Sequence, residues 1–415
     1  MKKFSGILLL IIAALIVVSC SDDNTTEPTD PPPPLTYKIG VLIPLTGVAS
    51  LNGRQSQVAV EYAVADINQY FSISNIKVKI QAIYKDSGTD SLQAQKMLRE
   101  FAADSIKIVI GPYSSTVLRG LKHIADSAGI LLISHSSIST SLAFENDNIF
   151  RFVPTAKWQA KALAKMMLAD NKKVVIPLVK DDFWGNTLFN DVYKELENSS
   201  LTLQTPEFYP SSQTNFSSIL QRIQSKIKNL QNTFLDDEIA VYMITYGEGT
   251  EIMRQCSYLD VIKNIKFYGC NAFAWNSALL QNDLAASTAI STKLECPIMG
   301  FNEDYSSRYT PLIEKITNKI AHDPDSYALS IYDAAYVAGY TLSLTGDKED
   351  IDKIKSKVRS VLGTYAGING KIELDKNDDR INVFYDFMKV KHDDNIYSWL
   401  KSAVYNTETD ELIKK

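Results

Sequence analysis

Apolar residues along this chain repeat with two spacings that alternate from one segment to the next. A period of two predicts a strand, and it is clearest at Ile76, Val78, Ile80, Ala82 and Tyr84. Spacings of three and four predict a helix with one buried face, as at Ala94, Met97, Leu98 and Phe101. Strands and helices that alternate in this way are typical of βα units, which build parallel sheets.

The alternation runs twice along the chain. The first run predicts strands at 39–43, 76–84, 106–110 and 130–134. The second, after Phe152, predicts helices at 160–168, 188–196 and 216–227 and strands at 174–179, 239–244 and 265–268. A folded part of about 380 residues is too long for one ordinary core. The pattern therefore predicts an α/β fold class with two doubly wound parallel-sheet lobes.

The N-terminus has the features of an export signal. Lys2-Lys3 precedes the apolar run Ile7–Val18, which is too short to span a bilayer, and small residues lead to Cys20. We expect residues 1–19 to be a lipoprotein signal peptide and Cys20 to be the lipid attachment site. A plain signal peptide with a coincidental cysteine is the alternative. Residues 20–35 then form an acidic, proline-rich tether.

This signal predicts a protein of the cell envelope that faces the periplasm or the exterior and contacts the membrane only through its lipid anchor. A net charge of -5 leaves no broad basic surface, so we expect no nucleic-acid partner. The sequence lacks the GxSxG, GxxxxGK and HExxH motifs, and its four histidines are widely spaced. We expect no catalytic residues, no metal and no cofactor. Cys256, Cys270 and Cys296 suit buried core positions or a single disulfide of undetermined pairing.

Ligands of open parallel sheets bind beyond the carboxyl ends of the strands, so the loops after strands are candidate sites. In the first lobe these loops contain Asn52, the run Gly111–Thr116 and the run Ser134–Thr140. Their hydroxyls and the free N–H groups of a helix start suit a carboxylate, although Ser115 could instead only cap its helix.

The second lobe offers aromatic residues at the same kind of position. Trp184 follows one predicted strand, Tyr246 and Glu248 follow another, and Asn271 follows a third. A cleft with hydroxyls on one side and aromatic rings on the other suits a small ligand with an anionic end and an apolar or cationic body.

The strand, loop and helix of Ile39–Tyr70 resemble the opening unit of the type I periplasmic solute-binding proteins, the family of the leucine/isoleucine/valine-binding protein. The resemblance extends from about Tyr37 to Leu400 and includes the late segments Tyr327–Tyr336 and Gly367–Asp375. It implies two lobes joined by a hinge that the chain crosses three times, near Pro154, Met299 and Gly367. Lobe 1 would comprise 36–154 plus 300–366, lobe 2 would comprise 155–299 plus 367–403, and 404–415 would be a C-terminal tail.

The resemblance also implies roles for single residues. The loop Gly111–Ser115 is similar to the family loop whose serine holds a ligand carboxylate, so Ser114 or Ser115 inherits that role. Ser136 and Ile138 match positions that supply a backbone N–H and a threonine hydroxyl. Because Ile138 has no hydroxyl, Ser137 or Ser139 could replace it, or only the backbone donor remains.

In the second lobe, Trp184 and Tyr246 match family aromatics, and Asn271 stands where amino-acid-binding members place an acid against the ligand ammonium. Glu248 or Asp182 could supply the missing charge. The implied function is capture of an amino acid or a related carboxylate or amide by hinge closure, with delivery to an ABC permease complex. The alternative is a lipid-anchored sensor or envelope-assembly regulator that uses the same fold without transport.

Overall fold

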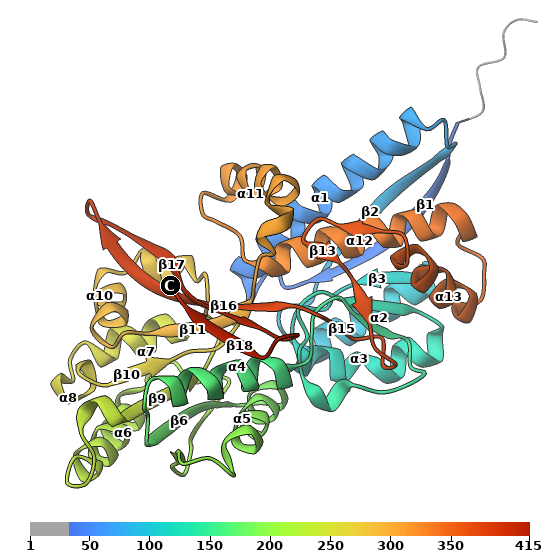
Figure 1. The fold of residues 1–415 in the computed structure, drawn as a ribbon. Coiled ribbons are helices and arrows are strands. Elements are labelled where there is room, and N and C mark those ends of the chain that lie inside the picture. Colours follow the sequence, from blue (N-terminus) through green and yellow to red (C-terminus); the bar gives the residue numbers. More distant parts are fainter. Residues whose placement is uncertain (1–32) are drawn as a thin grey trace, which may run out of the picture. The chain divides into compact units, whose positions relative to one another are not determined.

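The computed structural model describes residues 33–415, and Leu35–Lys415 form one compact unit that contains two large sheets (Figure 1). The predictions for the signal peptide, for Cys20 and for most of the tether lie outside the described residues. No helix within 33–415 is both long enough and apolar enough to cross a membrane.

Lobe 1 contains a five-stranded, wholly parallel sheet in the order β2-β1-β3-β4-β5. Its strands are β1 (Leu35–Ile43), β2 (Val78–Asp86), β3 (Ile108–Ile110), β4 (Leu131–Ser134) and β5 (Ile149–Arg151). Its helices are α1 (Ser50–Ile73), α2 (Ser91–Ala103), α3 (Ser115–Ala128), α11 (Ser306–Ile320), α12 (Ser326–Thr345) and α13 (Ile351–Leu362), with 3-10 turns η1 (Thr140–Leu142) and η3 (Glu303–Tyr305).

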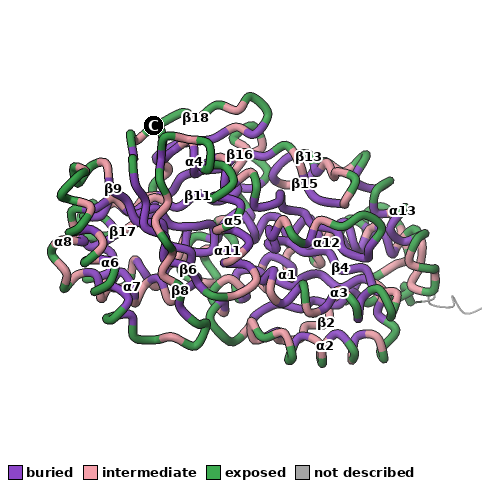
Figure 2. The backbone as a smooth tube through the Cα atoms, turned by 90° about the horizontal axis from the view of Figure 1, so that it is seen from below, coloured by how far each residue is buried: buried purple, intermediate pink, exposed green. Residues whose placement is uncertain are grey.

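Successive residues in the second half of β1 point into two different cores, which is why Ile39–Ile43 is apolar and buried. Val41 and Ile43 pack in the cluster that contains α1 and α12 residues, whereas Leu42 packs in the cluster that contains α2 and α3 residues. Helices therefore cover both faces of the sheet, as in doubly wound folds. In Figure 2 the outer helix α2 alternates between exposed and buried segments, in keeping with its single buried face.

Lobe 2 contains a nine-stranded sheet in the order β18-β17-β16-β11-β10-β9-β6-β7, with β8 also paired to β6. Its strands are β6 (Val174–Asp181), β7 (Thr202–Leu203), β8 (Glu207–Pro210), β9 (Ile239–Ile244), β10 (Lys266–Tyr268), β11 (Glu295–Met299), β16 (Phe384–Asp393), β17 (Ile396–Asn406) and β18 (Glu411–Lys414). Its helices are α4 (Ala156–Ala169), α5 (Phe183–Leu196), α6 (Ser217–Leu230), α7 (Gly249–Cys256), α8 (Asp260–Lys263), α9 (Ser277–Leu280) and α10 (Asp283–Ser291), with the 3-10 turn η2 (Asp236–Glu238).

The α/β fold class is confirmed, but the sheet of lobe 2 is mixed rather than wholly parallel. Strands β6 to β11 pair in parallel, and β16, β17 and β18 add an antiparallel edge. Residues 404–415, which we expected to form a tail, include the end of β17 and the whole of β18. The alternation of that segment is too short to distinguish a covering strand from a tail.

The chain passes between the two lobe cores at three places. Phe152 packs in the lobe 1 core and Val153 in the lobe 2 core, and the second passage follows Met299. At the third, Ile372 still packs in lobe 1 and Val383 is the first residue in lobe 2, so the passage lies later than Gly367. Two short hairpins precede it, β12 (Ala366–Gly367) with β13 (Gly370–Lys371) and β14 (Glu373–Leu374) with β15 (Arg380–Ile381).

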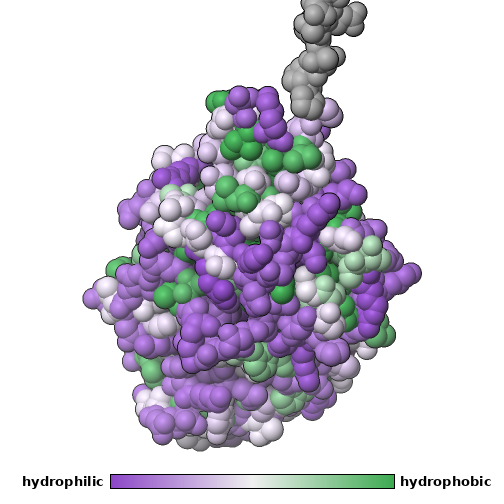
Figure 3. Space-filling model, turned by 90° about the vertical axis from the view of Figure 1, so that its right-hand side faces the viewer, coloured by the Kyte–Doolittle hydropathy of each residue, from purple (hydrophilic) through white to green (hydrophobic). Residues whose placement is uncertain are grey.

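The surface is mainly polar on the face seen in Figure 3, where apolar residues form small separate groups. Scattered apolar residues of this kind are normal for a folded protein. Within the described part of the chain, Cys256, Cys270 and Cys296 are free and buried. Burial raises the pKa of the Cys256 and Cys270 thiols to about 12, so these side chains are protonated core residues.

Candidate functional site

A glycine sets the course of the loop between β3 and α3. Gly111 has a φ of +110°, and a Cβ at this position would lie 2.1 Å from the backbone oxygen of Leu42. Only glycine permits this approach, which brings the loop against β1. Ser114 then occupies the N-cap position of α3, but its side chain makes no capping hydrogen bond. Its hydroxyl is free to face the other lobe.

The serine hydroxyls of lobe 1 fall into two groups. Ser136 Oγ donates to the carbonyl oxygen of Tyr113 at 2.8 Å, and Ser137 Oγ lies 3.3 Å from the same oxygen. Ser115 Oγ accepts from the backbone N–H of Ser139 at 3.2 Å. These three serines join the β3–α3 loop to the loop after β4. Because a hydroxyl has a single proton, the Ser136 hydroxyl cannot also donate to a ligand, which leaves its backbone N–H for the predicted role.

Besides Ser115, whose Oγ only accepts, two hydroxyls remain available. Ser114 Oγ accepts only from the phenol of Tyr246, at 3.4 Å, so its own proton is uncommitted. Ser139 is 1% exposed, and its Oγ has no hydrogen-bond partner within residues 33–415. A buried hydroxyl without a partner costs free energy unless a ligand or water satisfies it. Ile138 packs in the lobe 2 core, and its carbonyl accepts from Ala156 N–H.

Arg151 holds the loop that carries these serines. Its guanidinium donates to the carbonyl oxygens of Ser139 at 2.6 Å and Ser137 at 3.3 Å. It also forms a buried ion pair with Asp379, whose carboxylate accepts from Nε and Nη2. The second of the two short hairpins is thereby tied to the strand β5 and to the serine loop.

The aromatic side of the site lies in lobe 2. Trp184, near the start of α5, stacks on Tyr246, with ring centroids 4.5 Å apart and an angle of 28° between planes. Both side chains are buried, and burial raises the pKa of the Tyr246 phenol. The backbone N–H of Trp184 also reaches Thr116 Oγ1 of lobe 1, at 3.4 Å. The stacked pair therefore meets the β3–α3 loop directly.

The carboxylates near these rings are already engaged. Glu248 Oε1 lies 2.8 Å from Lys180 Nζ and 3.1 Å from the phenol of Tyr209. Asp182 caps α5 by accepting from Gly185 N–H at 2.7 Å, and burial raises its pKa. Glu248 Oε2, however, is buried and has no hydrogen-bond partner in the described residues, although Lys180 balances the charge of this carboxylate.

Asn271 provides a neutral acceptor instead. Its Nδ2 donates to the phenol of Tyr327 at 2.9 Å, whereas its buried Oδ1 has no partner in the described part of the chain. Tyr327 belongs to the first turn of α12 in lobe 1, and it contacts Tyr113 edge to face with centroids 6.2 Å apart. Asn271 therefore joins the lobes and leaves one oxygen that can accept an N–H or O–H group.

Asn52 has a supporting position. Its Nδ2 donates to Asp325 Oδ2 at 3.0 Å, and the other oxygen of Asp325 caps α12 by accepting from Tyr327 N–H. Asn52 therefore fixes the start of α12, and with it the placement of Tyr327. Burial raises the pKa of Asp325.

Tyr113 and His135 lie in the two loops that the sequence selects as candidates, whereas Tyr327 was not expected beside the site. His135 lies 5.8 Å from the Tyr113 ring, and its Nε2 is 3.3 Å from Ser56 Oγ. Full burial lowers the pKa of its imidazole to about 3, so the ring is neutral at physiological pH. The capping pattern of Asp325 before an apolar run was the available signal for Tyr327.

The assembled site contains free hydroxyls, an amide oxygen and stacked rings, with its charges paired or capped. Within residues 33–415, no group of three or more His, Cys, Asp or Glu side chains could hold a metal ion. Such a site can bind and orient a small ligand with a polar end and an apolar body.

Residues 36–395 match the family model described as periplasmic binding protein. An uncharacterized protein of Methanocaldococcus jannaschii is 24% identical over 90% of this chain and 91% of its own length. Among solved structures, the leucine binding protein LivK of Thermotoga maritima has a TM-score of 0.71 at 17% identity, covering 90% of this chain and 99% of that one. An ABC transporter solute binding protein of Rhodopseudomonas palustris, in complex with 3,4-dihydroxy benzoic acid, also has a TM-score of 0.71, at 18% identity with 89% and 97% covered.

Proposed function

Because this chain belongs to the periplasmic binding protein family, we propose that it captures a small organic carboxylate between its lobes and delivers it to an ABC importer. Membership confirms the resemblance to leucine-binding proteins and makes the chain an extracytoplasmic binding protein rather than an enzyme. The contact between Ser114 and Tyr246 carries the proposal, since it brings a free hydroxyl of lobe 1 against the stacked rings of lobe 2.

The ligand carboxylate would accept hydrogen bonds from Ser114, Ser139 and the first N–H groups of α3. Its apolar body would stack on Trp184 and Tyr246. An apolar or aromatic acid or a related amide fits these groups. The solute binding protein of R. palustris, solved with 3,4-dihydroxy benzoic acid, supports this class.

An α-amino acid fits less well because the open carboxylate oxygen near the rings, Glu248 Oε2, belongs to a group whose charge Lys180 already balances. Asn271 is neutral, Glu248 is paired with Lys180 and Asp182 caps a helix. A buried ammonium without a counter-charge is costly. The likeness to a leucine binding protein supports the amino-acid alternative.

The test is isothermal titration of the full chain, unfolded and refolded beforehand to remove carried-over ligand. The titrants are 3,4-dihydroxybenzoate, its amide, 4-methylpentanoate and leucine, the last two having the same carbon skeleton with and without the amine. We expect 4-methylpentanoate to bind at least tenfold more tightly than leucine, a difference of about 1.4 kcal/mol. Tighter binding of leucine would overturn the ligand class but keep solute capture. Failure of the whole panel to bind refolded protein would favour the sensor or regulator alternative.

We propose in addition that Cys20 carries the lipid anchor, on the strength of the charged start, the short apolar run and the small residues before the cysteine. Mass spectrometry of the protein from its own membrane should give an acylated N-terminal peptide that starts at Cys20. In Cys20→Ala the protein should leave the membrane fraction. A processed N-terminus with an unacylated cysteine would overturn the lipid anchor and favour the plain signal peptide.

A further inference from the structure

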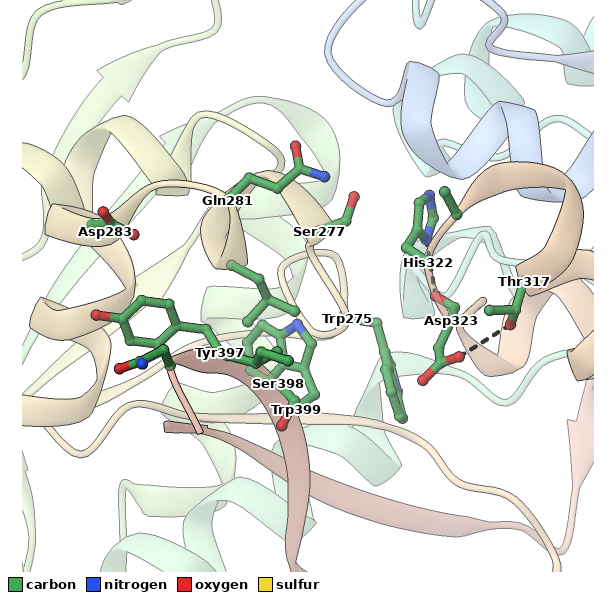
Figure 4. A pocket seen from close by; sticks show the side chains of 14 residues that line it. Trp275, Ser277, Gln281, Asp283, Thr317, His322, Asp323, Tyr397, Ser398 and Trp399 are labelled. Carbon is green, nitrogen blue, oxygen red and sulfur yellow. Dashed lines mark hydrogen bonds between the residues drawn. The ribbon is translucent and has the colours of Figure 1, made fainter. Parts of the chain in front are cut away.

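A pocket of about 490 Å³ lies apart from the candidate site, and none of the site residues named above borders it, although the loop beyond Asn271 does (Figure 4). Lobe 1 contributes the end of α11 and the residues after it, and lobe 2 contributes the loop and helices from Trp275 to Asp283. The turn between β16 and β17 and the start of β17, Asn395–Trp399, complete the wall.

Three aromatic rings line this pocket, and each is held in place by a separate contact. Trp399 Nε1 donates to the carbonyl oxygen of Asn276 at 3.3 Å. Tyr397 stacks on His392 with centroids 4.4 Å apart. Trp275 packs edge to face on Phe301, 6.3 Å away, and its Nε1 is buried without a partner in the described residues. Rings fixed in this way present their faces to an occupant at little entropic cost.

The charged groups that line the pocket are mainly negative. Asp283 comes from lobe 2 and Asp323 from lobe 1, and the lining includes one histidine, His322, but no lysine or arginine. Neither carboxylate forms an ion pair within residues 33–415, and Asp323 accepts a hydrogen bond from Thr317 Oγ1 at 3.0 Å. In Figure 4, Asp323 and His322 lie on one side of Trp275, while Tyr397 and Trp399 lie on the other.

We propose that this pocket binds a small organic cation, an amine or a quaternary ammonium, between the aromatic rings and the two carboxylates. Aromatic faces attract cations through their quadrupole, and an unpaired carboxylate in the same pocket adds Coulomb attraction. A neutral sugar could use the same rings, but it would gain nothing from the two unpaired carboxylates. The occupant would contact α11 of lobe 1 and the β16–β17 hairpin of lobe 2 at once.

The test titrates the full chain with choline and with 3,3-dimethylbutan-1-ol, which has the same shape without the charge. Tryptophan fluorescence and isothermal titration report binding. We expect choline to bind saturably and its neutral analogue to bind at least tenfold more weakly, with choline binding weakened by added salt. Equal binding of both compounds, preference for a neutral sugar, or no saturable choline binding would each overturn the proposal.

Variants locate the bound cation. Trp275→Ala should weaken choline binding roughly tenfold, and Asp323→Asn roughly fivefold. Asp323 is exposed, so its substitution should leave folding intact, and Asp104→Asn, at an exposed position of the same lobe, is the matched control. An equal effect of Asp323→Asn and Asp104→Asn would show that choline responds only to net charge and would overturn the site. Competition with 3,4-dihydroxybenzoate would instead place choline in the first site.

Discussion

The two halves of the candidate site are held in different ways. In lobe 1 the loops around Ser114 and Ser139 are fixed by hydrogen bonds, with a buried ion pair behind them. In lobe 2 the site consists of stacked rings that belong to a large apolar core. We expect the polar half to lose stability or ligand binding when one hydrogen-bond or ion-pair partner is removed. We expect the aromatic half to lose them when contact area is removed. The difference can be tested one half at a time.

The largest effect on stability should come from the ion pair behind the serine loop. Asp379→Asn leaves the Arg151 guanidinium buried without a counter-charge, which we expect to cost about 3–5 kcal/mol of unfolding free energy. Denaturant titration measures it. The control is Asp378→Asn, which breaks the neighbouring pair with Arg359, a side chain that is 48% exposed. A cost for Asp379→Asn no larger than for Asp378→Asn would contradict the role given to the buried pair.

The aromatic half is tested at Tyr246. Tyr246→Ala removes a ring that stacks on Trp184, so we expect a loss of about 3 kcal/mol in stability and the loss of measurable ligand binding. Tyr246→Phe keeps the ring and removes only the 3.4 Å contact with Ser114, so most of the binding should remain. Denaturant titration and calorimetry measure the two effects. Equal loss in both variants would show that the phenol, not the ring, matters.

His135 gives the polar half a pH effect of its own. The folded pKa of His135 is about 3, below its unfolded value of about 6.5, so the unfolded chain binds the proton more readily between these values. The stability that the neutral ring contributes is present above about pH 6.5 and is lost as the pH falls towards 3, about 2 kcal/mol by pH 5. Unfolding at several pH values measures the slope. His135→Gln should reduce the dependence of the unfolding free energy on pH. An unchanged dependence would show that other titratable groups cause it.

The smallest effects should distinguish free hydroxyls from engaged ones. Ser114→Ala and Ser139→Ala should each weaken carboxylate binding roughly tenfold, because each would remove a donor to the proposed ligand carboxylate. Ser137→Ala should change it little, since that hydroxyl lies over backbone carbonyl oxygens. Calorimetry with 3,4-dihydroxybenzoate measures all three. A larger effect at Ser137 than at Ser139 would contradict this division.

The sequence selected the loops of the candidate site but not the contacts that its side chains make. The rule that ligands bind after strand ends selected Ser114, Trp184, Tyr246 and Asn271, which the structure brings to the facing sides of the two lobes. The rule could not tell that the Ser139 hydroxyl is free and the Ser136 hydroxyl is engaged. Their hydrogen bonds depend on how two loops from different βα units meet. The pairing of Glu248 with Lys180 joins residues 68 positions apart and has no local signal.

The fold shows the same limit. Hydrophobic periodicity predicted the α/β class and both lobes, since long buried strands and helices carry a strong pattern. It failed for short elements such as β14, β15 and β18, which have two to four residues each. Whether Ile372 belongs to one lobe or the other is decided by tertiary packing alone.

The position of β18 has a practical consequence for the C-terminus. This strand pairs with Ala403–Asn406, the end of β17, whose backbone groups would otherwise be open to pairing. An uncovered strand edge is a template for strands of other molecules. Truncation before Glu411 should therefore produce self-association and aggregation, even though the removed residues lie at the end of the chain and contribute nothing to either pocket.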